Sequence, residues 1–423
     1  MFHALYTLLL SLLILITLPW WIWRYLRTPK YRDTVPQRFG LALPALPPGP
    51  RIWIHAVSVG EVMAAQGLIQ QLALRYPDRQ LLLSTVTKTG QQIARSLPGI
   101  QATFYLPVDL PWIVNRVLAS LQPQALIVLE TELWPNLFWH CKQRQIPVIL
   151  VNGRLSPRSF RHYRLFRRFM ERFLQPVQLF AMQSAADAER MRALGVAAER
   201  IVNTGNLKYD QAMQAADPAK LAELAARLPP PDGLIWLAAS THPGEEKILL
   251  DTLQTLRRQW PALRLILVPR HPEREAEVTA LLQQSGLSHV RFSCLTAPWQ
   301  EEVLLVDQVG WLTRLYRYAQ IAFVGGSLIP HGGQNMLEPA SQGIATLFGP
   351  HTSNFREAVR QLLEADAAIQ LREQTELLST MQQLLADPAR RQQLGERAQQ
   401  VVAANTGALQ RTMHTLQPWL ERT

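Results

Sequence analysis

Short apolar runs alternate with amphipathic stretches along most of the chain after residue 50. The apolar runs have the length of buried strands, and the stretches between them repeat with the period of a helix. Such alternation is typical of βαβ units, in which helices join parallel strands and cover both faces of the sheet. It predicts the α/β class, built from doubly wound, Rossmann-like sheets.

The alternation occurs twice, so the sequence predicts two Rossmann-like domains. The expected strands are 52–57, 81–86, 125–130, 148–151 and 179–183, followed by 234–240, 264–269, 320–325 and 345–349. We expect an N-terminal domain at 30–210, a linker at 211–232, a C-terminal domain at 233–405 and a C-terminal helix at 406–423. Two domains of this kind bind ligands at the carboxyl ends of their strands, in the cleft between them.

A membrane anchor helix is expected at residues 1–25. Residues 4–23 carry no charge, and a helix of that length spans about 30 Å, the thickness of a bilayer core. Tryptophans near its end and the arginines that begin at Arg24 predict a single-pass anchor with both domains in the cytoplasm. A cleaved signal peptide is disfavoured, because no Lys or Arg precedes the run and no small-residue cleavage site follows it. A half-inserted helix is the alternative, since Pro19 would break the far end.

The charge of the chain predicts an anionic partner. Lys and Arg total 43 against 32 Asp and Glu, a formal net charge of +11, which suits nucleic acid, a phosphate-rich small molecule or an anionic membrane surface. No recognised DNA- or RNA-binding motif accompanies the charge, so nucleic acid is not an expected partner. The two cysteines, Cys141 and Cys294, are too few for a disulfide scaffold and form no zinc-binding pattern.

Part of this charge lies at residues 154–172, where arginines and aromatic residues recur at helical spacing. A helix with one aromatic and one cationic face suits an anionic membrane surface or a phosphorylated lipid. The alternative is a solvated charged face above a stripe of core residues. The arginines expected to contact a lipid acceptor are Arg154, Arg161, Arg164 and Arg168.

Four residues of the N-terminal half are candidates for chemistry. Glu61 opens a helix, where it is either a general base or a complement to the helix dipole, and position alone slightly favours the dipole. Glu130 and Glu132 stand at the end of a strand, and capping of the next helix would explain Glu132 better than Glu130. Lys208 either neutralises an anionic ligand group or pairs with Asp210 on the surface, and the surface pair is the simpler interpretation.

Three loops that follow strands of the C-terminal half together predict a nucleotide site. Residues 240–246 carry hydroxyls, a histidine and the start of a helix, and residues 268–274 carry an arginine beside a histidine. Residues 323–339 contain paired glycines and a helix expected from Asn335, so that backbone can approach a ligand and amides can face an anion. Glu338 would accept hydrogen bonds from ribose hydroxyls. The pattern is neither a P-loop nor GxGxxG.

Seven motifs follow the anchor in a fixed order. They are WIHAVSVGEV at 53–62, ETELWPN at 130–136, GNLKYD at 205–210, STHPGEE at 240–246, PRHPER at 269–274, GGSL…GGQNMLEP at 325–339 and GPHTSNF at 349–355. In this order they closely resemble the bacterial 3-deoxy-D-manno-octulosonic acid (Kdo) transferases. The resemblance implies a GT-B fold with an acceptor-binding N-terminal domain and a CMP-binding C-terminal domain. It implies inverting transfer of Kdo from CMP-Kdo to the lipid A precursor at the inner membrane, with no metal or other cofactor.

The resemblance also implies roles for individual residues. Glu61 would be the general base, and Glu130 and Lys208 would stabilise the transition state. The CMP contacts that it implies are Pro269, Arg270, Val309, Gly310, Trp311, Asn335, Met336, Leu337 and Glu338. The family has a glutamate where this chain has Trp311, so a contact there survives only if the backbone around Gly310 makes it.

The residue types suit this chemistry. An in-line displacement needs one base for the acceptor hydroxyl, and Glu61 suits that role if its surroundings raise its pKa. The departing phosphate needs positive charge, which Arg270 and Lys208 would supply. Two alternatives stand beside this interpretation: a GT-B enzyme with a different nucleotide-sugar donor, and a non-catalytic, membrane-associated binding protein. The joint presence of Glu61, Glu130 and Lys208 argues against the binding protein, which needs no base.

Overall fold

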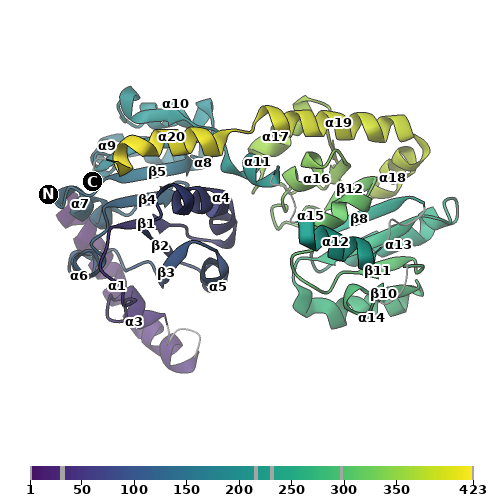
Figure 1. Cartoon of the computed structure of the whole chain (residues 1–423), viewed down its shortest axis with the longest axis horizontal. Coiled ribbons are helices and arrows are strands. Elements are labelled where there is room, and N and C mark those ends of the chain that lie inside the picture. Colours follow the sequence, from purple (N-terminus) through teal and green to yellow (C-terminus); the bar gives the residue numbers. More distant parts are fainter. Residues whose placement is uncertain (1, 29–33, 214–217, 229–232, 296–298, 422–423) are drawn as a thin grey trace. The chain divides into compact units, whose positions relative to one another are not determined.

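The chain folds as two compact units in the computed structural model, which describes residues 2–28, 34–213, 218–228, 233–295 and 299–421 (Figure 1). One unit comprises residues 1–211 together with 406–423, and the other comprises residues 212–405. The C-terminal helix, expected as a separate element, therefore belongs to the first unit. Parts of the expected linker, residues 214–217 and 229–232, lie outside the described residues.

The first unit is built on a parallel sheet. Among the described residues it has seven strands in the order β3-β2-β1-β4-β5-β6-β7. These are β1 (Arg51–His55), β2 (Gln80–Thr85), β3 (Ile100–Tyr105), β4 (Ala125–Leu129), β5 (Val148–Gly153), β6 (Val177–Met182) and β7 (Ile201–Asn203). The chain order reverses between β1 and β4, the kind of switch point at which doubly wound sheets bind ligands.

Helices cover both faces of this sheet. They are α1 (Phe2–Arg27), α3 (Val35–Arg38), α4 (Val59–Arg75), α5 (Lys88–Ser96), α6 (Pro111–Leu121), α7 (Pro135–Gln143), α8 (Pro157–Leu165), α9 (Arg167–Leu174), α10 (Ala185–Ala193), the 3-10 turn η1 (Ala198–Arg200), α11 (Leu207–Ala212) and α20 (Ala408–Leu420). Alternate strand residues face opposite cores, so Trp53 enters one core and Ile54 the other. α20 packs against α4, and Asp210 accepts hydrogen bonds from the first backbone amides of this C-terminal segment, Gly407 and Leu409.

The second unit repeats the architecture. Its sheet is also parallel, with seven strands among the described residues in the order β10-β11-β9-β8-β12-β13-β14. The strands are β8 (Ile235–Thr241), β9 (Arg264–Pro269), β10 (His289–Arg291), β11 (Val303–Leu305), β12 (Ile321–Val324), β13 (Ala345–Phe348) and β14 (Ile369–Gln370). The helices are α12 (Pro218–Arg227), α13 (Glu245–Arg257), η2 (Pro272–Arg274), α14 (Glu275–Ser285), η3 (Phe292–Cys294), α15 (Leu312–Leu315), η4 (Tyr316–Tyr318), α16 (Leu337–Ser341), α17 (Arg356–Glu364), α18 (Glu376–Ala386) and α19 (Pro388–Ala404).

The predicted α/β class with two doubly wound sheets is confirmed. The sequence missed β3, β7, β10, β11 and β14, most of which lie at the edges of the sheets. Four of these five strands have only two or three residues, and β3 is half-exposed over much of its length. The edge strands carry no continuous apolar run, so hydrophobic pattern alone does not reveal them. β11 is internal and apolar, but it has only three residues.

The apolar N-terminal segment forms one helix, α1. Pro19 lies inside it without ending it, so the expected break at this proline is wrong. Among the described residues, α1 is the one helix whose length and composition would allow it to cross a membrane.

Candidate active site

Three of the predicted residues gather in the first unit, beginning with Glu61 in the first turn of α4. Its carboxylate turns back toward the strand end and accepts hydrogen bonds from the Val57 backbone N–H at 2.7 Å and the Ser58 hydroxyl at 3.0 Å. Only 8% of Glu61 is exposed. Burial, and next the negative charge of Glu130, raise the pKa of Glu61 to about 7. A carboxylate that serves only the helix dipole has no need of such an environment.

Glu130 follows the last residue of β4 and pairs with Lys208. Its Oε1 lies 3.4 Å from the Lys208 ammonium, and both side chains are largely buried. The backbone of Glu130 has φ 56°, in the left-handed region that non-glycine residues rarely adopt. A strained glutamate at a strand end is typical of a functional site, because the surrounding fold must hold it there.

Lys208 is positioned by two asparagines. The Asn152 side chain, at the end of β5, accepts a hydrogen bond from the Leu207 N–H at 3.0 Å, and Asn206 accepts one from the Lys208 N–H at the same distance. These bonds satisfy the first amides of α11, which presents Lys208 to Glu130. The surface pair with Asp210 is therefore wrong. Asn152 was not predicted from the sequence, where the only signal is an asparagine directly after the apolar run 148–151; in the structure its backbone has φ 54°.

Glu132 joins the same cluster. The sequence favoured a helix cap at this residue, but α7 begins at Pro135 and its N-cap, Trp134, makes no side-chain cap. Burial, and then the charge of Glu130, raise the pKa of Glu132 to about 7. The charge of Glu132 also contributes to the raised pKa of Glu61 and to that of the Tyr163 hydroxyl on α8. The cluster thus holds three carboxylates and one ammonium.

The basic segment at 154–172 is two helices, α8 and α9, separated at Phe166, and not the single helix expected. Arg161, Arg164 and Arg168 are exposed on these helices, whereas Arg154 is half-buried beside the acidic cluster. The Arg154 backbone N–H donates to the Thr131 hydroxyl at 3.1 Å, and Thr131 lies between Glu130 and Glu132 in the chain.

In the second unit a buried glutamate holds the glycine-rich loop after β12. Glu245, at the start of α13, accepts hydrogen bonds from four backbone N–H groups, those of His242, Gly326, Ser327 and Leu328. Burial nevertheless raises its pKa. A Cβ at Gly325 would lie 2.6 Å from the Ser240 carbonyl oxygen, so this glycine is required for the close approach of two loops. Glu245 could not be singled out from the sequence, because three of its four partners lie more than eighty residues away.

The loops that follow β8 and β9 meet through two histidines. The rings of His242 and His271 lie 5.9 Å apart, and the Arg270 backbone N–H donates to the Thr241 carbonyl at 3.0 Å. Burial, and next the charge of His331, lower the pKa of His242 to about 4, which keeps the ring neutral. Pro269 is buried and the Arg270 side chain is exposed. The structure therefore leaves the Arg270 guanidinium accessible to an anionic ligand.

The helix expected at Asn335 is shorter than predicted. α16 begins at Leu337 and has five residues, so Asn335 lies just before the helix and not within its first turn. Asn335 instead donates to Glu338 at 3.0 Å and accepts from the Leu337 N–H at 3.1 Å. Burial raises the pKa of Glu338. Met336 and Leu337 are fully buried.

The three residues 309–311, at which a CMP contact is expected, have different environments. Val309 is exposed, and Gly310 has φ 91° with open space beside it. The Trp311 side chain is 8% exposed and packs on Phe292 at 5.0 Å between ring centroids. The indole is therefore a core side chain, and a ligand could meet the backbone around Gly310 here.

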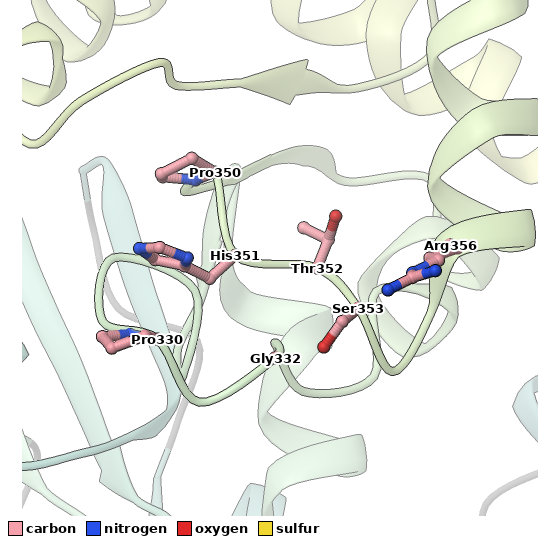
Figure 2. A pocket seen from close by; sticks show the side chains of 7 residues that line it. All are labelled: Pro330, Gly332, Pro350, His351, Thr352, Ser353 and Arg356. Atoms are coloured by element: carbon pink, nitrogen blue, oxygen red, sulfur yellow. The ribbon is translucent and has the colours of Figure 1, made fainter. Parts of the chain in front are cut away.

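A polar cavity of about 430 Å³ lies beside the glycine-rich loop. It is lined by Pro330, Gly332, Pro350, His351, Thr352, Ser353 and Arg356. Figure 2 shows Arg356 on one side of this cavity and His351 on the other, with Thr352 and Ser353 between them and their hydroxyls pointing in opposite directions. A guanidinium with a hydroxyl close by suits a carboxylate or phosphate. Among the described residues, no group of three or more His, Cys, Asp or Glu side chains is placed to hold a metal ion.

Comparison with known proteins gives a consistent result. A family model described as 3-deoxy-D-manno-octulosonic-acid transferase (kdotransferase) matches residues 33–211. The chain is 38% identical over 400 residues to the 3-deoxy-D-manno-octulosonic acid transferase of Haemophilus influenzae, which covers 94% of this chain and 93% of that protein. It is 35% identical over 416 residues to the protein of the same name from Bordetella pertussis, covering 95% of each.

A solved structure supports the fold. UDP-GlcNAc 2-epimerase from Neisseria meningitidis, bound to UDP-GlcNAc, aligns with a TM-score of 0.60 at 14% identity, covering 87% of this chain and 100% of that one. At this identity the likeness concerns the fold alone. It agrees with the predicted GT-B arrangement of two Rossmann-like domains.

Proposed function

The chain belongs to the Kdo transferase family of glycosyltransferases, and on that premise we propose that it transfers Kdo from CMP-Kdo to a hydroxyl of the lipid A precursor, with Glu61 as general base. The reaction is an inverting displacement that uses no metal. The acceptor oxygen forms a bond to the anomeric carbon of Kdo, its proton passes to Glu61, and the bond from that carbon to the CMP phosphate oxygen breaks. CMP leaves with the bonding electrons.

The observation that carries this proposal is the environment of Glu61. A general base works best when its pKa is close to the pH at which it operates, and burial beside Glu130 raises the pKa of Glu61 to about 7. The Val57 amide and the Ser58 hydroxyl each bind one carboxylate oxygen and so orient the side chain. Each oxygen keeps a further lone pair with which to accept the proton of the acceptor hydroxyl.

Lys208 supplies positive charge on the same unit. Its ammonium would stabilise negative charge that develops in the transition state, and Glu130 holds the ammonium in place through the 3.4 Å ion pair. Asn152 acts through Lys208, because it positions the first turn of α11. It is therefore a positioning residue.

The second unit would hold the donor. Arg270 offers an exposed guanidinium to the CMP phosphate, and the backbone around Gly310 and Asn335 offers polar groups to the nucleoside. The cavity beside Arg356 offers groups suited to the carboxylate of Kdo. Arg161, Arg164 and Arg168, exposed on α8 and α9, would meet the phosphates of the acceptor at the cytoplasmic face of the inner membrane.

The experiment is a transfer assay with the detergent-solubilised full chain, a tetraacylated lipid A precursor and fresh CMP-Kdo in EDTA, followed by mass spectrometry. The expected product is the precursor heavier by one or more Kdo units. Glu61→Gln should abolish the product while binding CMP as the unsubstituted protein does. Product only with added magnesium would contradict the metal-free mechanism. Product from a UDP-sugar in place of CMP-Kdo would indicate a different donor, and CMP binding without any product would favour a binding protein.

A further inference from the structure

The N-terminal helix α1 has two chemically different faces. The half-buried residues between positions 3 and 17 recur at intervals of three or four: His3, Tyr6, Thr7, Leu10, Ser11, Ile14 and Thr17. Every polar side chain of this stretch is in that set. The large residues of the opposite face are exposed and entirely aliphatic: Leu5, Leu8, Leu9, Leu12, Leu13, Leu15 and Ile16. The helix is therefore sided in a way that a simple count of apolar residues does not reveal.

The polar face of α1 is docked on the first unit. The Tyr6 hydroxyl donates to the buried Asp109 carboxylate at 3.0 Å, and the Thr7 hydroxyl donates to the Asn136 side-chain oxygen at 3.1 Å. The His3 ring lies 4.3 Å from the Trp139 ring, between centroids. A small cavity of about 200 Å³ lies next to Tyr6 and is lined mostly by residues of the first unit outside α1. These contacts join the first turns of α1 to α7 and to the loop before α6.

This docking is incompatible with a helix that crosses the bilayer. If residues 4–23 spanned the membrane, Thr7 would lie about 25 Å beyond Arg24, at 1.5 Å per residue, and on the opposite side from the enzyme. Asn136, its partner, belongs to the same compact unit as Glu61. One unit cannot meet Thr7 on the far side of the membrane and hold the cytoplasmic chemistry on the near side.

We propose that α1 is a monotopic anchor: it stays docked on the first unit and inserts only its aliphatic face into the cytoplasmic leaflet of the bilayer, so that both of its ends remain on the cytoplasmic side. The proposal concerns topology and goes beyond the proposed reaction. It differs from the single-pass anchor that the sequence predicts.

The surface next to α1 supports the proposal that its aliphatic face contacts this leaflet. Phe173 of α9 contacts Tyr6 at 5.6 Å between ring centroids, so α9 lies beside α1. At the end of α8 and directly after it, Leu165 and Phe166 are exposed among arginines. At the other end of α1, the Arg24 guanidinium lies 4.8 Å from the ring centroid of Trp20. An aliphatic face flanked by arginines and tryptophans is typical of a helix that lies in the interface of an anionic membrane.

The test is cross-linking in isolated membranes with the full chain. Cys294 is replaced by serine, which leaves the buried Cys141. A short bismaleimide is then applied to His3→Cys/Trp139→Cys and to the matched control Leu9→Cys/Trp139→Cys, whose position 9 lies on the aliphatic face. The expected result is an intramolecular cross-link, seen as a mobility shift, in the first variant and none in the control. A folded first variant without the cross-link would overturn the proposal.

A second measurement is independent of the cross-linker. The single variant His3→Cys, which retains the exposed Cys294 of the second unit, is treated with a membrane-impermeant maleimide in intact spheroplasts. We expect neither thiol to react from the periplasmic side. Labelling of the His3→Cys thiol while Cys294 stays protected would show that α1 crosses the bilayer. If loss of Trp139 unfolds the chain, Tyr6→Cys/Phe173→Cys provides the same cross-linking test.

Discussion

Replacing Glu61 by glutamine is expected to abolish transfer and, at neutral and alkaline pH, to stabilise the protein. Glutamine keeps the size of the side chain and an oxygen that can accept the hydrogen bond from the Val57 N–H. It cannot ionise. The buried site holds a carboxylate whose pKa is about 7 instead of the ordinary 4.5, so ionised Glu61 weakens the fold.

The magnitude follows from that change in pKa. At about 1.4 kcal/mol per pH unit, a rise from 4.5 to about 7 corresponds to about 3 kcal/mol. The folded state holds the proton more tightly than the unfolded state. The penalty is therefore absent below about pH 4.5, grows as the pH rises, and is complete above about pH 7. We compare the free energy of unfolding of Glu61→Gln with that of the unsubstituted protein. The advantage of the variant should be about 2 kcal/mol larger at pH 8 than at pH 5, which corresponds to roughly 4–8 °C in Tm.

The assay is thermal unfolding in detergent at pH 5 and pH 8, alongside the transfer assay. The matched control is Glu189→Gln, since Glu189 pairs with Arg192 at the surface and its side chain is 71% exposed. This control should change neither activity nor the pH dependence of Tm. Equal Tm differences for Glu61→Gln at both pH values would refute the burial argument. Retained transfer would refute the role of Glu61 as the base.

The remaining predictions concern the pH dependence of transfer, Lys208, Asn152 and Glu245. Because the base must be deprotonated, kcat/KM should rise with pH and level off above about pH 7; a flat profile down to pH 5 would contradict this role for Glu61. Lys208→Met should lower kcat roughly 100- to 1000-fold with little change in CMP affinity measured by calorimetry. Asn152→Ala should destabilise α11 by about 1 kcal/mol and lower kcat more than KM changes, whereas an equal effect on stability with normal kcat would show a structural role only. Glu245→Gln should place an amide donor among four backbone donors, lower the Tm and weaken CMP binding, since the glycine-rich loop loses its anchor.

The class of fold could be predicted from the sequence because the central strands are recognisable from their apolar residues. β1, β4, β5 and β8 are buried on both faces, so each contains a continuous apolar run. Edge strands such as β7 and β14 are short and partly exposed, and their pairing with a neighbour is what makes them strands. No local pattern in the sequence predicts that pairing.

The candidate site divides in the same way. The motifs identify Glu61, Glu130 and Lys208 as candidates. Residue position alone favoured a helix-dipole role for Glu61 and a surface ion pair for Lys208. The ion pair of Lys208 with Glu130 joins residues 78 positions apart, and the raised pKa of Glu61 depends on burial under the rest of the unit. Asn152 binds a backbone amide 55 residues away, Glu245 binds three that lie more than 80 residues away, and the pKa of Glu132 depends first on burial.

Local periodicity and short motifs were enough to predict the two α/β units, the apolar helix at the start and the family. Tertiary structure decided which charges meet, which side chains are buried and which face of α1 is docked. Hydrophobic period and motif spacing are properties of neighbouring residues. Desolvation, ion pairing and backbone strain depend on atoms brought together by folding, and these set the protonation of Glu61, the partner of Lys208 and the surface against which α1 rests.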